Sequence, residues 1–362
     1  MSKDKKNEFV PGYAVPPGET LLDTLEAIGM SQAELAERTG RPKKTINEII
    51  KGKSAIKPET ALQFERVLGI PAGFWNNLER NYQETLARIN EQKRLQGQID
   101  WLKKIPLNAL IKLGRVKKHS DKIQQLQEVL NFFGVVSPEQ WETRWMGAQV
   151  SYRTSNIFSD NPYAIAAWLR IGELTARNIS CKPFDASKFK SGLISIRQLT
   201  VKPPEPFQGE VIRLCADTGV AVAFVPEIPG IRASGATWWV NPHKAVIQLS
   251  LRYKSDAQLW FSFFHEAGHI LLHGKKEVFI EGDGKNSKED EADSFASDFL
   301  IPPKQYRQFI QSGGYSKTAI QQFAAELGIA PSIVVGRLQH DQKIHHSFCN
   351  DLKKRFAWKK SA

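Results

Sequence analysis

Two histidines separated by three residues carry the clearest chemical signal in this sequence. They lie in the string His265-Glu266-Ala267-Gly268-His269. Residues at i and i+4 of an α-helix lie on one face, so both imidazoles can bind one zinc ion at about 2 Å while the glutamate between them reaches a water on that ion. The spacing predicts His265 and His269 as metal ligands and Glu266 as the catalytic general base.

An acidic segment that follows the histidines supplies a candidate for the third ligand. In the helix expected there, Glu289 lies one turn before Ala292 on the apolar side. A carboxylate that faces a core needs a partner, which a zinc ion opposite two histidines would provide. We therefore expect Glu289 to be the third ligand, and Asp293, four residues later, to hydrogen-bond a ligand histidine and orient it.

The same residues allow other interpretations. The two histidines could be a hydrogen-bonded pair in the core, and Glu289 could be an acid favoured by the dipole near a helix N-terminus. Glu291, on a different face of that helix, is the second candidate ligand. His273, one turn after His269, could replace Glu289, although a structural hydrogen bond near the helix end fits it better.

The flanking sequence predicts a small sheet and a buried helix around these residues. Short β-type runs separated by Pro and Gly turns give three expected strands, at residues 220–225, 236–240 and 245–249. The helix predicted over 256–273 is apolar on almost every side, so we expect it to be buried against that sheet. Earlier helices are expected at residues 121–133, 138–145, 163–178, 185–199 and 207–217. The expected fold class is α+β and mostly helical.

The N-terminal residues predict a compact all-helical unit with a helix-turn-helix. Ser31 and Glu34 form a capping box that opens one helix, Gly40 ends it, and a second short helix begins after Pro42. In the second helix the isoleucines fall on one stripe, and the opposite polar stripe is free to meet a partner. Residues 41–57 hold six basic side chains and one acidic side chain.

This basic face predicts contacts with a double-stranded DNA operator. Ammonium groups suit phosphates, and the donors of other side chains suit purine edges in the major groove. We expect phosphate contacts from Lys43, Lys51 and Lys53, and base-edge contacts from Arg41, Lys44, Thr45 and Asn47. A solvated basic face is the alternative. Because one short helix contacts too few bases for specificity, we expect a homodimer on a pseudo-palindromic site.

A helical connector is predicted between the helix-turn-helix unit and the domain with the metal motif. The stretch from Phe74 to Lys104 has helix-forming composition and few breakers, which predicts one extended helix. Residues 80–122 carry 11 basic and 4 acidic side chains, so this segment could also contact flanking DNA. The expected domains are a DNA-binding domain at 1–79, a helical connector at 80–150 and a domain with the metal motif at 151–362.

Composition and charge limit the class of protein. The chain has 362 residues and a net charge of +12, and no stretch approaches the ~20 uncharged apolar residues of a membrane helix. No apolar signal segment follows the N-terminus, so we expect a cytoplasmic protein without a membrane partner. The three scattered cysteines do not fit a disulfide frame or a cysteine zinc cluster.

Two family resemblances rest on longer strings. Residues of about 150 to 340 resemble the ImmA/IrrE family of zinc endopeptidases through the strings at 265–273, 289–296 and 328–340. Residues of about 16 to 82 resemble the Xre-type helix-turn-helix of HigA-like antitoxins through the strings at 31–36, 56–61 and 74–78. The first resemblance implies a gluzincin-like α+β fold with a zinc ion and, in several members, cleavage of a DNA-bound repressor.

Together these observations predict a DNA-binding regulator, similar to an antitoxin, with a zinc metallo-endopeptidase domain. Its expected substrate is a repressor or antitoxin-type protein, cleaved in cis or in trans. Arg252, Tyr253 and His340 are candidates for stabilising the oxyanion. The alternative is a non-enzymatic dimeric antitoxin or repressor whose zinc fold binds a partner toxin or senses a signal.

Overall fold

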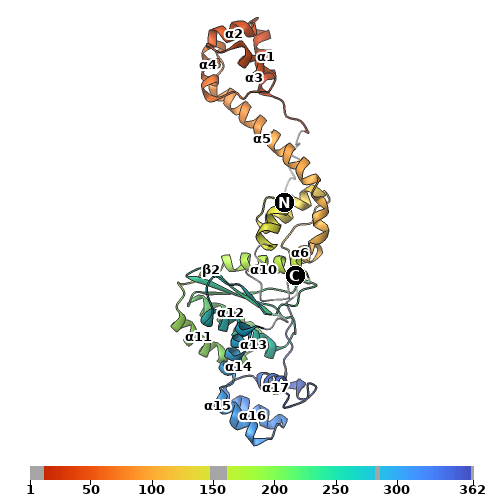
Figure 1. Cartoon of the computed structure of the whole chain (residues 1–362), viewed down its shortest axis with the longest axis vertical. Helices are drawn as coiled ribbons and strands as arrows, with labels where there is room; N and C mark the ends of the chain where they lie inside the picture. The colour runs from red at the N-terminus through yellow and green to blue at the C-terminus, as the bar shows by residue number, and fades with distance from the viewer. Residues whose placement is uncertain (1–11, 147–160, 282–285, 360–362) are drawn as a thin grey trace, which may run out of the picture. The chain divides into compact units, whose positions relative to one another are not determined.

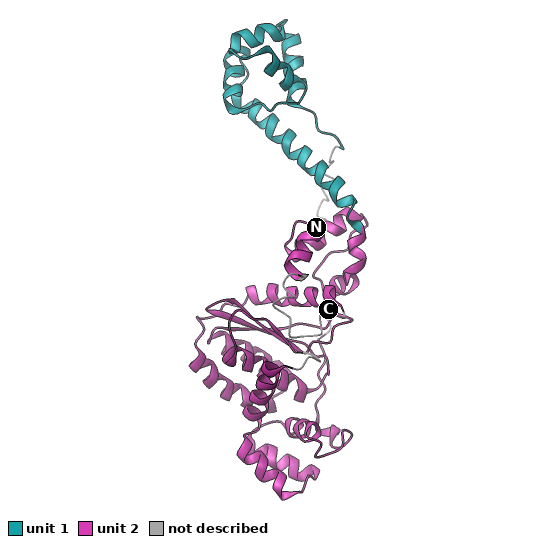
Figure 2. Ribbon diagram, in the orientation of Figure 1, with its two compact units in different colours: residues 1–99 teal, residues 100–362 magenta. Residues whose placement is uncertain are grey.

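The computed structural model describes residues 12–146, 161–281 and 286–359. The chain forms two compact units, Met1–Ile99 and Asp100–Ala362, each described here by itself (Figure 2). The described residues are mostly helical, and the second unit holds a small sheet (Figure 1), so the predicted α+β fold class is confirmed. The predicted domain boundary near residue 150 lies outside the described residues.

The first unit is a helical domain whose helix ends follow the predicted signals. Its helices are α1 (Pro17–Ala27), α2 (Gln32–Thr39), α3 (Lys43–Ile50), α4 (Pro58–Leu68) and α5 (Ala72–Gln96). The Ser31 hydroxyl accepts a hydrogen bond from the Glu34 backbone N–H at 3.1 Å, which caps α2. Gly40 ends that helix in the left-handed conformation that glycine adopts without strain. Ile46 and Phe64 are fully buried in the core of this unit.

Helix α5 packs on α1 and α4 near its start and then runs on as a polar helix. Its buried side chains are Ala72 and Trp75 at one end and Leu95 at the other. The prediction of one helix as far as Lys104 is wrong, because α5 ends at Gln96 and a 3-10 helix, η1 (Ile99–Lys104), follows. Gly97 stands at this break, and glycine has the poorest helix propensity after proline.

The second unit begins with short helices packed around aromatic side chains. They are α6 (Leu107–Lys112), α7 (Lys122–Phe133), α8 (Pro138–Trp141) and a π-helical turn, η2 (Glu142–Met146), and α10 (Pro162–Arg177) follows. The ring of Phe133 meets the rings of Trp101 and Trp141 at centroid distances of 6.2 and 5.7 Å. Arg170 of α10 is buried and donates from Nε to the Phe132 carbonyl at 2.7 Å, which joins α10 to α7.

A four-stranded mixed sheet forms the centre of the second unit. Its strands are β1 (Val220–Phe224), β2 (Gly235–Asn241), β3 (Lys244–Leu249) and β4 (Phe279–Ile280), in the order β1-β3-β2-β4. Strand β3 pairs in parallel with β1 and antiparallel with β2, which also pairs antiparallel with β4. The three predicted strands are confirmed, and the fourth was missed because two residues carry no periodic pattern.

Both faces of the sheet are covered by helices. Alternate residues of a strand point to opposite faces, and Val222 and Ile247 accordingly lie in the large core formed with α11 (Ala186–Gln198), α12 (Pro204–Ala216) and α13 (Asp256–Leu272). On the other face, Ala221 and Val246 pack on Ala176 of α10. The predicted burial of the 256–273 helix against the sheet is confirmed by its contacts with β2 and β3.

Helix α13 packs most extensively against α14 (Ser287–Leu300), and a glycine lets the two approach. A Cβ atom on Gly268 would lie 3.3 Å from Ala292 Cα and 3.1 Å from a ring carbon of Phe295. The chain continues through α15 (Pro303–Ser312), α16 (Lys317–Leu327), α17 (Pro331–His340) and η5 (Asn350–Leu352). In the described ranges no single helix has the length and apolar character of a membrane span, and α16 and α17, bent by 115°, reach that composition only when joined.

The segment after α17 folds back onto the start of α13. The Asp256 backbone N–H donates to the Lys354 carbonyl, and the Phe356 N–H donates to the Lys254 carbonyl, both at 3.0 Å. The ring of Phe356 packs on Phe207 at a centroid distance of 5.7 Å. This return places residues from the end of the chain beside the helix that carries the two histidines.

Candidate functional site

Three side-chain atoms of α13 and α14 converge on one buried point. The Nε2 atoms of His265 and His269 lie 3.0 Å apart, and Glu289 Oε2 lies 3.1 and 3.6 Å from them. Ligand atoms about 2.1 Å from a tetrahedral ion are about 3.4 Å apart, so this triangle has the size that one metal ion requires. The structure therefore contains a possible His-His-Glu metal site whose three residues are all buried.

The outer ring nitrogens of the histidines are also bonded. His265 Nδ1 lies 2.8 Å from Asp293 Oδ1, as predicted for an orienting carboxylate. His269 Nδ1 lies 2.9 Å from His273 Nδ1, and His273 Nε2 lies 3.3 Å from Glu291 Oε2. The geometry thus places His273 and Glu291, the two alternative ligand candidates, on the outer side of His269.

These outer bonds determine which ring nitrogens carry protons. A carboxylate only accepts hydrogen bonds, so His265 donates to Asp293 from Nδ1, and neutral His273 donates from Nε2 to Glu291. The Nδ1 of His273 is then an acceptor for Nδ1–H of His269. The inner Nε2 atoms of His265 and His269 face each other and the Glu289 carboxylate, so either a proton or a metal cation is needed between these atoms, and a metal ion would be bound by both Nε2 lone pairs.

The pKa values of these residues reflect the same contacts. Burial lowers the pKa of His269 to about 4, which keeps its ring neutral. Burial alone would raise the pKa of Glu289, but the hydrogen bonds from the two histidines outweigh it and bring the pKa to about 2. Burial opposes protonation of His265 too, yet its bonds to Asp293 and Glu289 raise its pKa well above the ordinary value.

Glu266 has a buried carboxylate without a hydrogen-bond partner. Its side chain is fully buried, and among the described residues neither Oε1 nor Oε2 has a partner. Burial raises its pKa well above the ordinary value of a glutamate. Gly235, at the start of β2, makes room for this carboxylate, because a Cβ there would lie 2.5 Å from Oε1. A buried carboxylate in this position would be satisfied by a hydrogen bond from a water molecule or a substrate.

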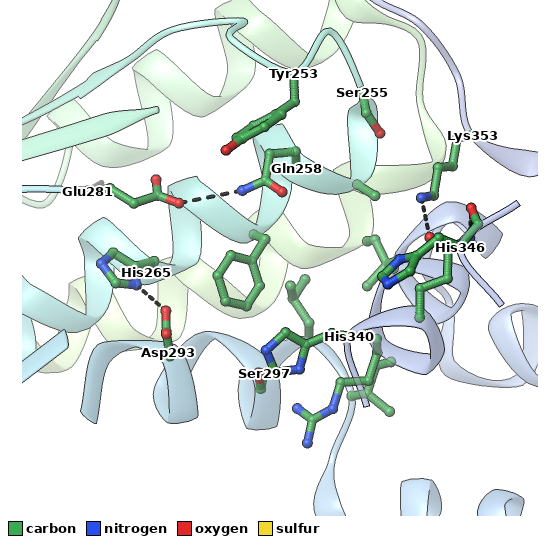
Figure 3. A pocket seen from close by; sticks show the side chains of 18 of the residues that line it. Tyr253, Ser255, Gln258, His265, Glu281, Asp293, Ser297, His340, His346 and Lys353 are labelled. Carbon is green, nitrogen blue, oxygen red and sulfur yellow. Dashed lines mark hydrogen bonds and ion pairs between the residues drawn. The ribbon is translucent and has the colours of Figure 1, made fainter. Parts of the chain in front are cut away.

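The metal site opens into a cavity of about 750 Å³ (Figure 3). His265, Glu289 and Asp293 line one end of it. Apolar side chains line it as well, namely Phe261, Leu300, Ile301 and Ile333. Of the three oxyanion candidates, Tyr253 and His340 line the cavity, whereas the Arg252 guanidinium stacks on the Tyr253 ring at 4.8 Å.

The segment after α17 forms the opposite wall, and Gln339 holds it in place. The buried Nε2 of Gln339 lies 3.1 and 3.0 Å from the carbonyl oxygens of His346 and Phe348, and 3.1 Å from Asn350 Oδ1. Its Oε1 accepts a hydrogen bond from Lys353 Nζ at 2.5 Å. Sequence reasoning missed this wall, because its position depends on contacts with side chains far away in the chain.

The predicted DNA contacts lie on α3 and beside it. Lys43, Lys44, Lys51 and Lys53 are exposed, and Arg41, Thr45 and Asn47 are half-buried. Two of the predicted base-reading side chains have partners within the domain: Arg41 Nε donates to Gln63 Oε1 at 2.5 Å, and Asn47 Nδ2 donates to Gln32 Oε1 at 3.5 Å. Lys44 Nζ lies 3.8 Å from Glu48 Oε1, whereas Lys43, Lys51 and Lys53 have no side-chain partner among the described residues.

Comparison with known proteins identifies two domains. Residues 21–75 match the helix-turn-helix family, and residues 228–339 match the M78 peptidase family described as the IrrE N-terminal-like domain. Both resemblances expected from the motifs are thereby confirmed for these ranges. The metal site, Glu266 and most of the cavity lie within the second range.

Individual relatives match about a fifth to a quarter of this chain. Virulence-associated protein A of Dichelobacter nodosus is 34% identical over 67 residues, which cover 18% of this chain and 64% of that protein. A HigA-family addiction module antidote protein from Coxiella burnetii is 28% identical, with 23% of this chain and 92% of that chain covered and a TM-score of 0.22. The antitoxin HigA of Pseudomonas aeruginosa, solved with the higBA promoter, is 28% identical, with 24% and 94% covered and a TM-score of 0.22.

Proposed function

We propose that this chain, which joins a helix-turn-helix domain to an IrrE N-terminal-like domain, is a DNA-binding regulator with zinc-dependent endopeptidase activity. The observation that carries the proposal is the triangle of His265, His269 and Glu289 beside the unpartnered carboxylate of Glu266. Two imidazoles and one carboxylate are a ligand set that leaves a fourth position of a tetrahedral zinc ion open, as hydrolytic sites require.

Each residue of the site has a separate role in the proposed peptide hydrolysis. Zinc held by these three ligands would acidify a water molecule and polarise the carbonyl of a peptide bond. Glu266 would accept a proton from the attacking water and donate it to the leaving amine. Asp293 holds the His265 ring in the tautomer that presents Nε2 to the site. Tyr253 and His340 line the cavity, which supports them as candidate hydrogen-bond donors to the oxyanion.

Metal analysis and intact mass test this activity. Protein purified without chelators is expected to hold one zinc per chain, and His265→Ala is expected to lose it. Glu266→Gln removes the base but no ligand, so it should keep the zinc and lose hydrolysis. The metal-loaded protein is incubated with itself and with candidate repressors and antitoxins, and intact mass reports cleavage in cis or in trans. Cleavage by Glu266→Gln at the wild-type rate would contradict the role of Glu266.

The N-terminal domain is proposed to bind operator DNA as a homodimer. The exposed lysines of α3 and the turn after it support phosphate contacts, and Thr45 and Asn47 lie on the same helix and are the proposed base contacts. Lys51→Ala should weaken binding to all sequences and flatten the salt dependence, whereas Asn47→Ala should relax the preference at one position. Equal losses on every sequence from both changes would refute base reading by Asn47.

A further inference from the structure

The charges of the cavity are divided between its two ends. Its carboxylates are Glu289 and Asp293, which bond to His265, and Glu281, whose Oε1 accepts from Gln258 at 3.5 Å. Its permanent cations lie on α17 and the segment after it, at Arg337, Lys353 and Arg355. A ligand that spans the cavity from the metal site therefore leaves an acidic end and reaches a basic one.

Two of these cations lack a carboxylate. Arg337 Nε is paired with Asp341 Oδ2 at 2.8 Å. For Lys353 the described contact is the neutral amide oxygen of Gln339, and within the described ranges no ion pair involves Lys353 or Arg355. Burial lowers the pKa of Lys353, which is the effect expected of an ammonium held partly out of water.

The buried carboxylate of Asp256 already has hydrogen-bond partners. Asp256 lies close enough to Lys353 to influence its charge. Its oxygens, however, accept hydrogen bonds from the Ser332 hydroxyl at 2.7 Å and from the backbone N–H groups of Ala257 and Lys354 at 2.9 and 3.0 Å. A half-buried ammonium with only a neutral acceptor is stabilised when a further carboxylate binds to it.

The cations Lys353 and Arg355 lie outside the residues that match the IrrE N-terminal-like domain. The match to the IrrE N-terminal-like domain ends at residue 339. His340, His346, Lys353 and Arg355 all follow it and line the cavity; the first three are labelled in Figure 3. Gln339 fixes this segment through its four hydrogen-bond contacts, so the cations are held in place rather than carried on a loose tail.

We propose that the peptidase selects substrates with an aspartate or glutamate side chain close to the cleaved bond, and that Lys353 and Arg355 bind this carboxylate. The proposal rests on the function proposed above. The apolar side chains between the two ends, Phe261 and Ile333 among them, favour apolar residues in the intervening stretch of substrate. Lys353 and Arg355 are thus specificity-determining residues and take no part in bond breaking.

The test uses full-length, zinc-loaded protein and acetylated, amidated nonapeptides with an apolar centre. At each position in turn the peptides carry Glu, Gln or Lys. Cleavage is mapped by mass spectrometry, and peptide binding to Glu266→Gln is measured by fluorescence anisotropy. At one position, Glu should bind roughly tenfold more tightly than Gln, since a charge-assisted contact replaces a neutral one. The gain should appear in KM rather than in kcat, because the wall lies away from the reacting atoms.

Substitutions of Lys353 show whether the peptide preference depends on the charge of this side chain or on the structure of the segment after α17. Lys353→Gln should abolish the difference between Glu and Gln peptides, Lys353→Arg should retain it, and Lys353→Glu should favour the Lys peptide. Lys354→Gln is the matched control, because Lys354 is exposed and does not line the cavity. It should keep the preference of the wild type.

The outcomes distinguish this inference from the proposed function. Selective binding of Glu peptides without cleavage would refute the peptidase and leave the carboxylate site standing. Cleavage with equal affinity for Glu and Gln peptides, or a preference that survives Lys353→Gln, would overturn the carboxylate site alone. A requirement for a free C-terminus in place of an acidic side chain would also overturn it, and failure of every peptide to bind would overturn both.

Discussion

Gly235→Ala offers a sharp test of the role of Glu266, because it disturbs the base without touching a ligand. The added Cβ would lie 2.5 Å from Oε1, 2.8 Å from Cγ and 3.0 Å from Cδ of Glu266. Ordinary contacts of a Cβ begin near 3.4 Å, so the carboxylate must move by about 0.9 Å or β2 must shift by a similar amount. The strand backbone itself accepts alanine without strain, since Gly235 has no positive φ.

The expected loss follows from this displacement. A shift of about 1 Å in a catalytic group lowers rates by roughly 10²-fold. We therefore expect kcat/KM of Gly235→Ala to fall about a hundredfold, with the loss mainly in kcat. The free energy of unfolding should drop by about 1–3 kcal/mol, as in other overpacked cores. The zinc content should stay at the wild-type value, because the three atoms that the new methyl group approaches most closely all belong to Glu266, which is not a ligand.

The assay combines metal analysis, urea unfolding and steady-state cleavage of a mapped peptide. Gly209→Ala in α12 is the matched control, because no atom lies within 4 Å of its added Cβ. It should leave kcat/KM unchanged and should stabilise the helix by about 0.5–1 kcal/mol. A folded, zinc-loaded Gly235→Ala with wild-type kcat/KM would refute the reasoning, since a base displaced this far cannot serve equally well.

Three further predictions concern the surroundings of the site. Asp293→Asn should weaken zinc binding by roughly 10- to 100-fold, because His265 loses its orienting carboxylate; competition with a chelator measures this, and an unchanged affinity would contradict it. Gln339→Leu should speed hydrogen exchange in residues 341–353 and cost about 1–3 kcal/mol in urea unfolding, while equal exchange would show that other contacts hold the wall. Burial raises the pKa of Glu173, but its ion pairs with Arg170 and Arg177 outweigh burial and lower the pKa overall. These ion pairs therefore stabilise the fold above about pH 4.3, the pKa of an unfolded glutamate, and the stabilisation is lost as the pH falls through the pKa of Glu173 in the folded protein. Metal-free Glu173→Gln should therefore be less stable at pH 7 and lose less stability than the wild type between pH 5 and pH 3.5; parallel pH profiles would exclude this role.

Local signals in the sequence predict much of the fold. The cap at Ser31, the glycine end at Gly40 and the apolar pattern of residues 256–273 each depend on neighbours within a few positions, and the structure agrees with all three. The spacing of His265 and His269 likewise places both rings on one helix face. Glu289 could be selected because a helix face is also a local property.

Features that depend on distant contacts were not predictable in this way. Strand β4 is too short for a pattern and exists because Thr237 and Ala236 pair with it. The opening that Gly235 provides for Glu266 joins a strand to a helix that forms later in the chain. The cavity wall depends on Gln339, whose amide contacts four later residues. In each case the contacting residues lie too far apart in the sequence for a local pattern to reveal the contact.

The late position of the wall has a consequence for biosynthesis. During translation the helix-turn-helix emerges from the ribosome first and can fold early, since domains generally fold in the order of synthesis. The two histidines and Glu289 follow, but Lys353, Arg355 and the residues that pair with the start of α13 emerge last. On the proposed function, a nascent chain can thus engage DNA or acquire metal before the segment after α17 has completed the cavity. Its selectivity, on our proposal, is acquired only when synthesis has passed residue 355.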